Sequence, residues 1–350
     1  MKVFIVAAPL EGRSGVYRTT YDLVHEARGR GLDWSALVGM RRSAPAAARQ
    51  QSDAVEEAFV DGHGFAGVGE IKALLERSAA FHEADVVVTL ITQSDIAMST
   101  MAQRPRKTWV AFLRGMPWPV RGEQHVVKRL VQRVTESAAL SRADGIWATT
   151  DVLAREAGLQ GRATIVPAGI PSAARTHFGA LDEGTHAVWA GRLAVDKQPE
   201  LFVEAARASG IASRMFGAGP MESLVRSSAP PWVEVVGWVS PDELWRDASI
   251  FVGTSYREAF GRSAAEAALR GVPVIVGGSY GAAPLLFREA DLRETLVLDP
   301  QDQLRWGATM TELCRNAELR QRASDHLRES AELLTIAASV DRMLEELAAS

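Results

Sequence analysis

The chain has 350 residues, of which 47% are hydrophobic and 23% charged, and its formal net charge is -4. This composition is typical of a soluble globular protein and excludes a disordered chain or a fibre as the main state. The length favours two domains over one, and the small negative charge argues against a protein dominated by nucleic-acid binding.

Three further features concern the compartment. The single cysteine, Cys314, cannot form a disulfide within the chain, which favours a reducing compartment. The apolar run at the start ends at Glu11, too early for the core of a signal peptide, and is better explained as a buried strand. No apolar run approaches the length of a membrane span. We therefore expect a cytoplasmic protein that is at most peripheral to a membrane.

Strand-like and helix-like patterns alternate through the first half of the chain. Short β-rich runs predict strands at residues 2–8, 33–39, 85–91, 108–113, 145–150 and 163–169. Helical patterns lie between several of them, over residues 16–30, 69–82, 123–141 and 151–157. This strand–helix–strand rhythm predicts a parallel sheet covered by helices on both faces.

The rhythm restarts after residues 167–186, whose small, polar, Gly and Pro residues are typical of a linker. Strands are then expected at residues 186–191, 212–219, 232–239, 249–255, 272–278 and 294–300. Helices are expected near residues 198–209, 220–227, 241–247, 262–270 and 303–314. The last forty residues are also helical in character, and residues 333–339 would form a bend before the final helix.

These patterns predict an α/β fold of two Rossmann-like, doubly wound domains that face each other across a cleft, a natural place for a ligand. The first domain would span residues 1–170 and the second residues 171–332. Residues 333–350 would form a C-terminal helix that packs back on the first domain.

The stretch YREAFGRSAAEAALRGVPVIV, residues 256–276, places Glu258 and Glu266 on either side of Gly261. Gly261 lets a ligand approach the backbone, and the helix that starts at Arg262 directs its positive end to the same spot, which suits a phosphate. Glu266 has mostly apolar neighbours, and a buried carboxylate is costly unless it is paired or hydrogen-bonded. We therefore expect a partner for it. The alternative is an ordinary strand–loop–helix with two incidental glutamates.

Three other motifs precede this stretch. WAGRLAVDKQPELFVEAA, residues 189–206, presents Arg192 and Lys197 on a loop before a helix. Two such cations would hold a diphosphate and stabilise the charge that develops as it departs, whereas solvated loop cations are the alternative. FGAGP, residues 216–220, is a strand-to-turn glycine pair, and GWVSPDEL, residues 237–244, offers exposed backbone.

In this order, the four motifs resemble the nucleotide-sugar-dependent glycosyltransferases of the two-Rossmann-domain (GT-B) type, and most closely the retaining family numbered four (GT4). Glu258 and Glu266, with seven residues between them, match that family's E-x7-E motif. The resemblance is specific over residues 186–300 and looser in the first domain, where acceptors bind.

The resemblance implies a role for each matched residue. Arg192 and Lys197 would contact the donor diphosphate. Glu258 would hold sugar hydroxyls, and Glu266 would bind the ribose. The remaining donor-binding positions would be Ala259, Phe260 and Gly261 through their N–H groups, Val239 at the base, Gly217 and Gly219 along the pocket, and Gly12 and Gly15 of PLEGRSG near the phosphates.

One departure from the family concerns the first domain. Many members carry a histidine after a strand there, near the reacting sugar. The corresponding stretch, WVAFLRGMPWP, has none, and Arg114 stands in its place. Arg114 would therefore join Arg192, Lys197 and Glu258 as a catalytic residue, or else form a structural ion pair.

Metal dependence and mechanism follow from the same comparison. The chain has no D-x-D sequence and no His/Cys cluster with ligand spacing, so we expect no required metal and no cofactor besides the donor. The family's chemistry implies retention at the anomeric carbon, with the acceptor hydroxyl attacking on the leaving-group side. No second carboxylate is then needed as a covalent nucleophile.

The acceptor is unidentified, and one segment bears on it. Residues 104–142 contain nine basic residues against Glu123 and Glu136. With Trp118 and an apolar helix face, this segment is suited to an anionic partner: a lipid surface, a phosphorylated acceptor or a nucleic acid. The favoured explanation is nevertheless a core-packed helix with a solvated basic face. The apolar positions are Val126, Val127, Leu130, Val131 and Val134.

The expected function is that of a retaining, metal-independent glycosyltransferase of the hexosyltransferase type. It would move a sugar from a nucleoside-diphosphate sugar, expected to be UDP-linked, to an acceptor hydroxyl. The alternatives are a nucleotide-sugar epimerase or phosphorylase on the same fold, or a catalytically silent nucleotide-sugar binding protein. A nicotinamide dehydrogenase is disfavoured because no G-x-G-x-x-G follows the first strand.

Overall fold

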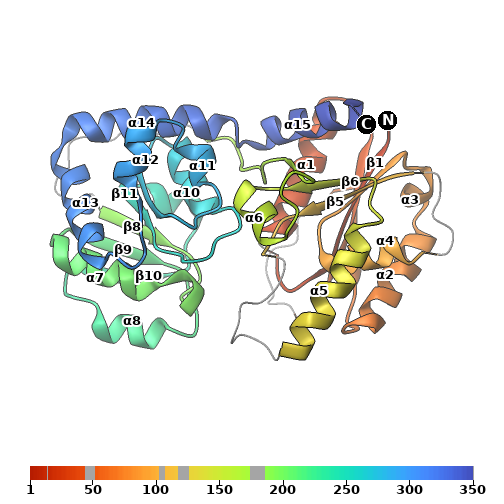
Figure 1. The fold of residues 1–350 in the computed structure, drawn as a ribbon, viewed down its shortest axis with the longest axis horizontal. Helices are drawn as coiled ribbons and strands as arrows, with labels where there is room; N and C mark the ends of the chain where they lie inside the picture. The colour runs from red at the N-terminus through yellow and green to blue at the C-terminus, as the bar shows by residue number, and fades with distance from the viewer. Residues whose placement is uncertain (14, 44–51, 102–106, 117–125, 174–185, 350) are drawn as a thin grey trace. The chain divides into compact units, whose positions relative to one another are not determined.

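The computed structural model describes residues 1–13, 15–43, 52–101, 107–116, 126–173 and 186–349 (Figure 1). The chain divides into two compact units. Unit 1 comprises Met1–Gly169 together with Ile336–Ser350, and unit 2 comprises Ile170–Thr335. Most of the predicted linker and Trp118 lie outside the described residues. Within the described residues, no helix combines the length and apolar character that crossing a bilayer requires.

Unit 1 contains a parallel sheet of seven described strands in the order β3-β2-β1-β4-β5-β6-β7. The central strand β1 is buried along its whole length, as expected for a parallel strand with helices on both faces. The strands are β1 (Val3–Leu10), β2 (Trp34–Met40), β3 (Val55–Phe59), β4 (Val86–Thr89), β5 (Thr108–Leu113), β6 (Gly145–Ala148) and β7 (Thr164–Ile165). The helices are α1 (Val16–Gly29), α2 (Phe65–Arg77), α3 (Ala79–Glu83), α4 (Thr92–Ser99), α5 (Val126–Leu140), α6 (Asp151–Glu156) and α15 (Ile336–Ala349).

Two apolar clusters fill the two faces of this sheet. Side chains alternate along β1, so that Val3 and Ile5 enter one cluster while Phe4 and Val6 enter the other. Helices α1 and α15 contribute to the first cluster, and α2, α4, α5 and α6 contribute to the second. The alternation explains how one short strand anchors both helical layers.

The C-terminal helix α15 belongs to unit 1 and packs beside α1. Its Ile336, Val340 and Met343 are buried in the first cluster. Arg30 Nη1 donates to Asp341 Oδ1 at 2.5 Å, and Ser339 Oγ donates to the Pro167 carbonyl at 2.9 Å. The prediction that the end of the chain returns to the first domain is confirmed.

Unit 2 repeats the architecture with six described strands in the order β10-β9-β8-β11-β12-β13, all parallel. The strands are β8 (His186–Ala190), β9 (Ser213–Phe216), β10 (Val233–Gly237), β11 (Ala248–Gly253), β12 (Val274–Gly277) and β13 (Val297–Leu298). The helices are α7 (Pro199–Ser209), α8 (Glu222–Ser228), α9 (Pro241–Trp245), α10 (Arg262–Leu269), α11 (Ala283–Leu286), α12 (Ala290–Leu296), α13 (Gln303–Arg315) and α14 (Ala317–Glu332).

The strand order reverses at the β8–β11 pair in unit 2 and at the β1–β4 pair in unit 1. In doubly wound sheets such a reversal leaves a crevice beyond the carboxyl ends of the two strands, because their following loops diverge to opposite faces. The predicted α/β class with two Rossmann-like sheets is confirmed. In unit 2 the reversal lies between the loop after β8 and the loop after β11.

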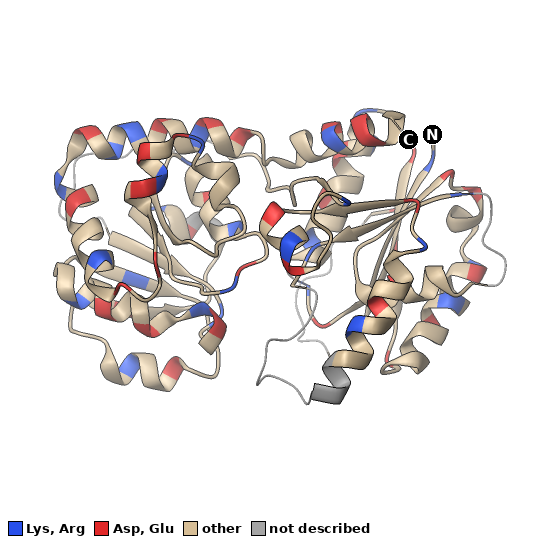
Figure 2. Cartoon of the chain, viewed as in Figure 1, with Lys and Arg blue, Asp and Glu red and all other residues tan. Residues whose placement is uncertain are grey.

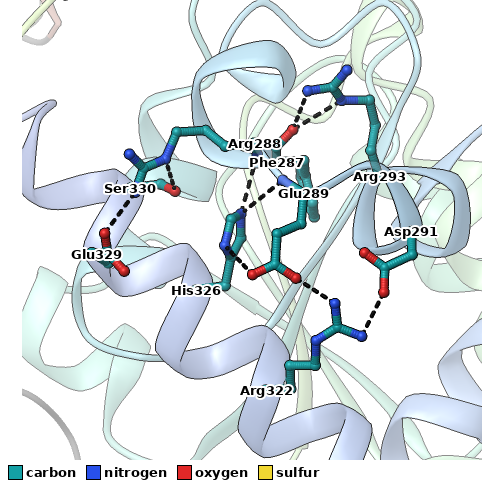
Figure 3. Close-up of polar contacts among 9 residues, drawn as sticks. All are labelled: Phe287, Arg288, Glu289, Asp291, Arg293, Arg322, His326, Glu329 and Ser330. Atoms are coloured by element: carbon teal, nitrogen blue, oxygen red, sulfur yellow. Dashed lines mark hydrogen bonds and ion pairs between the residues drawn. The ribbon is translucent and has the colours of Figure 1, made fainter.

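Helix α14 fastens the connection between α11 and α12 (Figure 3). The Nε2 atom of His326 accepts hydrogen bonds from the backbone N–H groups of Arg288 at 3.1 Å and Glu289 at 3.4 Å. Its Nδ1 atom lies 3.2 Å from Glu289 Oε1, so that nitrogen carries the ring proton. Arg322 pairs with Glu289 and, at 2.5 Å, with Asp291. The connection is thus held through both its backbone and its side chains.

Candidate functional site

Unit 2 contains a cavity of about 170 Å³ at the carboxyl ends of β8, β11 and β12. Its walls come from three strand-end loops, which parallel pairing brings to one edge of the sheet. The lining residues are Trp189, Ala190, Gly191, Lys197, Gly253, Ser255, Glu258, Arg262, Ser263 and Tyr280.

Lys197 and Glu258 form an ion pair in the cavity wall, with 2.5 Å between Nζ and Oε2. Each side chain is 19% exposed, so the pair is shielded from solvent but still reachable. Lys197 ends the short 3₁₀ turn η1 (Val195–Lys197) before α7, and its carbonyl accepts a hydrogen bond from Thr254 Oγ1 at 3.0 Å. The end of β11 therefore fixes the position of the lysine backbone.

The turn before α10 is shaped around Tyr280, which lies after β12. Gly261 has a φ of 93° and would bring a Cβ within 1.8 Å of Tyr280 Cε1, so only glycine fits there. The backbone N–H of Gly281 donates to the Glu258 carbonyl at 2.9 Å, and that of Ala282 donates to the Phe260 carbonyl at 2.7 Å. These bonds hold the loop that carries Glu258 against the segment after β12.

Burial raises the pKa of the Tyr280 hydroxyl well above its usual range, and the negative charge of Glu258 adds to the effect. Tyr280 therefore remains a neutral phenol at physiological pH. Its side chain lines the cavity together with Ser255 and Ser263, which also carry hydroxyl groups, and with charged residues such as Lys197.

The N-terminus of α10 forms another part of the wall, through Arg262 and Ser263. Gly261 is its N-cap residue and has no side chain to accept hydrogen bonds from the first-turn N–H groups. Those groups have no intrahelical acceptor and carry the positive end of the helix dipole. Together with Lys197, which also lines the cavity, these groups favour an anion.

The partner expected for Glu266 is Arg262, one turn earlier in α10, with 2.7 Å between Nε and Oε1. The two side chains are 19% and 26% exposed. Arg262 lines the cavity, whereas Glu266 is joined to the cavity through Arg262 and is not one of its lining residues. The predicted apolar surroundings of Glu266 are also present, since Ala264, Ala265 and Leu269 are buried.

Arg192 lies on the same loop as Lys197 but points elsewhere. Its side chain is 63% exposed and pairs with Asp196 at 3.0 Å, and it is not among the residues that line the cavity. The sequence predicts that Arg192 and Lys197 bind a diphosphate together. In this structure only Lys197 of the two reaches the cavity wall.

Gly217 and Gly219 are explained by packing within unit 2. A Cβ at Gly217 would lie 1.9 Å from the Gly191 carbonyl oxygen, and one at Gly219 would lie 2.4 Å from that of Leu193. Both glycines therefore pack closely against the backbone of the loop after β8. Val239, expected at the base of the nucleotide, is half-buried between β10 and α9, beside a Trp238 that is 75% exposed.

Three predicted site residues belong to unit 1. Gly12 and Gly15 lie between β1 and α1, and a Cβ at either would meet no atom within 4 Å. Gly15 has a φ of 43° and is the N-cap of α1. Arg114 follows β5, stacks over the Phe112 ring at 4.9 Å and donates from Nη2 to the Ala168 carbonyl at 2.8 Å. Arg114 thus has at least one structural role.

Tyr280, Ser255 and Trp189 line the cavity but are not among the site residues predicted from the sequence. The available signal was the stretch GGSYGAAP, residues 277–284, which follows a predicted strand just as the E-x7-E stretch does. Carboxyl ends of neighbouring parallel strands meet at one edge. The sequence alone does not give the order of the strands in the sheet, which places β12 beside β11. Among the described residues, no group of three or more His, Cys, Asp or Glu side chains is placed to hold a metal ion.

The part of the chain that contains the cavity resembles a known protein family. Residues 184–316 match the sequence model of the family described as glycosyl transferases group 1. Unit 2 contains a glycosyltransferase domain. The match includes every residue that lines the cavity. No curated protein gives a sequence match to the chain.

Solved structures similar to this chain include several glycosyltransferases. Sucrose-phosphate synthase from Thermosynechococcus elongatus has 19% identity and a TM-score of 0.79, with 100% of each chain covered. HepE of Anabaena, solved in complex with UDP and glucose, has 15% identity and a TM-score of 0.75, again with 100% of each chain covered. WaaG, a glycosyltransferase involved in lipopolysaccharide biosynthesis, has 17% identity and a TM-score of 0.69, covering 97% of this chain and 98% of its own. At these identities the likeness establishes the fold, and the GT-B expectation for the fold is confirmed.

Proposed function

We propose that the protein is a retaining glycosyltransferase of family four that uses a nucleoside-diphosphate hexose, with UDP as the nucleotide. The observation that carries the proposal is the pairing of Lys197 and Glu258 from two different strand ends, beside the N-terminus of α10. This arrangement lies inside the matched glycosyltransferase domain. A UDP donor is also supported by HepE, a similar fold that was solved with UDP and glucose.

The charged groups of the cavity would bind two different parts of the donor, the diphosphate and the sugar. The Lys197 ammonium and the α10 amides attract the diphosphate, whereas the Glu258 carboxylate repels it. Sugar hydroxyls donate hydrogen bonds to a carboxylate, so the sugar belongs on the Glu258 side. Glu266 would take the ribose, and its pairing with Arg262 holds it one turn inside the helix.

The reaction follows from these positions. The acceptor oxygen bonds to the anomeric carbon on the face from which the diphosphate leaves, and the bond between that carbon and the phosphate oxygen breaks. The acceptor's proton passes to the departing phosphate oxygen. Lys197 and the α10 amides stabilise the negative charge on the leaving group, a role that positioned donors perform well in sites shielded from water. On this proposal, these groups replace a required metal.

Nucleotide release from UDP- and GDP-sugars tests the proposal, with the acceptor replaced by water or by a panel of alcohols. Lys197→Ala and Glu258→Gln are each expected to lower kcat/KM at least 100-fold, since loss of one stabilising group costs about 2.7 kcal/mol or more. The matched control is Lys2→Ala, which removes the exposed Lys2–Glu83 pair at 2.8 Å in unit 1. Unchanged turnover in both site variants would refute the proposal, and binding without turnover would favour a silent binding protein.

A further inference from the structure

Thr254, the residue that follows β11, forms hydrogen bonds with two other segments of unit 2, and its side chain is fully buried. The indole Nε1 of Trp189, near the end of β8, donates to Thr254 Oγ1 at 2.9 Å. The Thr254 hydroxyl in turn donates to the backbone carbonyls of Lys197 at 3.0 Å and Gln198 at 2.8 Å. A hydroxyl has a single proton, so the two carbonyls share it. Thr254 therefore connects β8 and β11 to the loop before α7.

The two carbonyls lie on either side of the Cα atom of Gln198, whose backbone is strained. Gln198 has a φ of 45° and a ψ of 53°, and among the described residues no other residue with a side chain has a positive φ. This left-handed conformation is unfavourable for an L-amino acid, and a residue before a proline favours an extended backbone. Such a conformation persists only where surrounding contacts hold it. The Thr254 hydroxyl supplies a contact on both sides of Gln198.

The backbone of Gln198 determines where Lys197 lies relative to α7. The start of α7 is fixed in the core, since Pro199 and Leu201 are buried. A rotation at Gln198 would therefore move the residues that precede it, including Lys197. The Lys197 ammonium lies 2.5 Å from Glu258 Oε2 in the cavity wall, and such a movement would displace it. In an active site, a misplacement of about 1 Å can lower the rate about 100-fold.

The positive charge at the cavity depends on how individual cations are placed. Acidic and basic residues are interspersed along the helices of unit 2, as along α14 (Figure 2). Lys197 itself has acidic neighbours on two sides, Glu258 at 2.5 Å and Asp196 at 3.9 Å. The ammonium can contact a diphosphate only while it is held at the cavity wall, because Asp196 also attracts it.

We infer that Thr254 is a positioning residue for the transfer reaction. Its hydroxyl, held by the Trp189 indole, keeps Gln198 in the left-handed conformation and thereby places Lys197 for the donor diphosphate. Thr254 does not line the cavity, so it acts through Lys197 rather than by touching the donor. The inference rests on the proposed function and adds to it the residue that holds the cation in place.

Amide hydrogen exchange of the full chain without ligand tests whether Thr254 holds this loop. Thr254→Val keeps the shape of the side chain and removes the hydroxyl, whereas Thr254→Ser keeps the hydroxyl. The N–H groups of Lys197 and Gln198 donate to the carbonyls of Ala194 and Val195 at 2.9 and 3.2 Å, which protects them from exchange. We expect their exchange to be about tenfold faster in Thr254→Val and unchanged in Thr254→Ser. Unchanged exchange in Thr254→Val would refute the inference.

Calorimetry with UDP tests whether the effect passes through Lys197. Thr254→Val is expected to weaken UDP binding about fivefold, the contribution of one hydrogen bond, and Thr254→Ser to bind like the wild type. Lys197→Ala should weaken binding more. Adding Thr254→Val to Lys197→Ala should then change the affinity less than about twofold, because residues that act through one group are not additive. Fully additive effects would show that Thr254 does not act through Lys197.

Nucleotide release from UDP-sugars measures the effect on turnover. Thr254→Val is expected to lower kcat about tenfold or more and to raise the KM for the donor less than that, because Lys197 acts mainly on the charge of the leaving group. Thermal unfolding shows whether each variant folds. If Thr254→Val does not fold, Thr254→Cys takes its place, since a thiol of similar size is a weaker donor and should change exchange and binding in the same direction.

The matched control is Ser324→Ala on α14, which removes another buried hydroxyl of unit 2. Ser324 Oγ donates to the Gly271 carbonyl at 2.6 Å, before β12 and thus at the end of that strand opposite to the cavity. This variant should lose stability and keep the UDP affinity of the wild type. If it weakens UDP binding as much as Thr254→Val does, the effect is a general loss of stability and the inference is wrong.

Failure of the proposed function would give a different result. The wild-type chain would then neither bind UDP nor release nucleotide from UDP-sugars, which would also refute a role of Thr254 at the donor. The exchange data would still decide whether the Thr254 hydroxyl holds the loop of Lys197.

Discussion

Gly261 and Tyr280 occupy adjoining space so closely that a Cβ on residue 261 would lie 1.8 Å from Cε1 of the tyrosine ring. Gly261 also has a φ of 93°, and a left-handed conformation costs an L side chain roughly 1–2 kcal/mol. Gly261→Ala is therefore expected to lower the free energy of unfolding by roughly 2–4 kcal/mol, because strain and overpacking add. Urea unfolding measures the change. The control is Gly29→Ala, where a Cβ meets no atom within 4 Å, and equal stability of the two variants would contradict the described turn.

A purely structural role of the Arg262–Glu266 ion pair and a ribose-binding role of Glu266 lead to different predictions. The pair joins residues four apart on one helix and is partly exposed, so its loss should cost only a few tenths of a kcal/mol. If Glu266 binds the donor ribose, Glu266→Ala should instead raise the KM for the donor about tenfold or more, since a hydrogen bond to a charged group contributes roughly 1.5–3 kcal/mol. Urea unfolding and donor titration measure the two effects. A variant that loses stability but keeps its KM would show that Glu266 is structural.

Glu136 predicts a pH dependence of stability. Burial raises the pKa of its carboxyl to about 7, above the ordinary 4.5, although Thr92 Oγ1 donates a hydrogen bond to it at 2.9 Å. The folded state then binds more protons than the unfolded state between about pH 4.5 and pH 7. Stability should fall as the pH rises through this window, by on the order of 3 kcal/mol from this group.

The matched variant is Glu136→Gln, which keeps an oxygen for Thr92 and removes the charge. It should be more stable than the wild type at pH 8 and about equal to it near pH 5, as measured by urea unfolding at both values. Buried Asp95 contributes in the same sense, because burial and the charge of Glu136 raise its pKa as well. Exposed Glu318→Gln should leave the pH profile unchanged, and an identical profile for Glu136→Gln would contradict the account.

His326 should matter for the stability of unit 2. Its Nε2 atom accepts from two backbone N–H groups, so His326→Ala would leave both without this acceptor. One of these hydrogen bonds is exposed and the other part-buried, so water can replace the lost acceptor, and we expect a loss of roughly 0.5–1.5 kcal/mol. Thermal unfolding, compared with exposed His63→Ala, measures it. No difference between the two variants would contradict a stabilising role for His326.

Much of the fold is predictable from the sequence because buried parallel strands are nearly continuous apolar runs. The run Val3–Leu10 is such a case, and its position as the first strand is predicted correctly. Strand β3 was missed because it lies at the edge of the sheet, where Glu56 and Glu57 interrupt the apolar pattern. Helix α4 was also missed, since the residues of Thr92–Ser99 show little amphipathic periodicity.

The candidate site was predictable where the sequence places residues on one motif, and less so where the fold brings motifs together. The spacing of Glu258 and Glu266 identified one wall, but Tyr280 enters only because β12 is the neighbour of β11. Arg192 and Lys197 are five positions apart on one loop, and the sequence does not specify which of them turns inward. Likewise, the sequence does not show whether the apolar residues Leu130, Val131 and Val134 of α5 are covered by a neighbouring element. They were expected in the core, and the structure shows that they are exposed.

The position of the donor diphosphate tests the central claim most directly. A crystal structure of the protein with a UDP-sugar bound would locate it without reference to activity. We predict that the diphosphate lies within about 3 Å of Lys197 Nζ and of the first-turn N–H groups of α10, with the sugar against Glu258. A diphosphate bound away from the cavity lined by Lys197, Ser263 and Tyr280 would contradict the account.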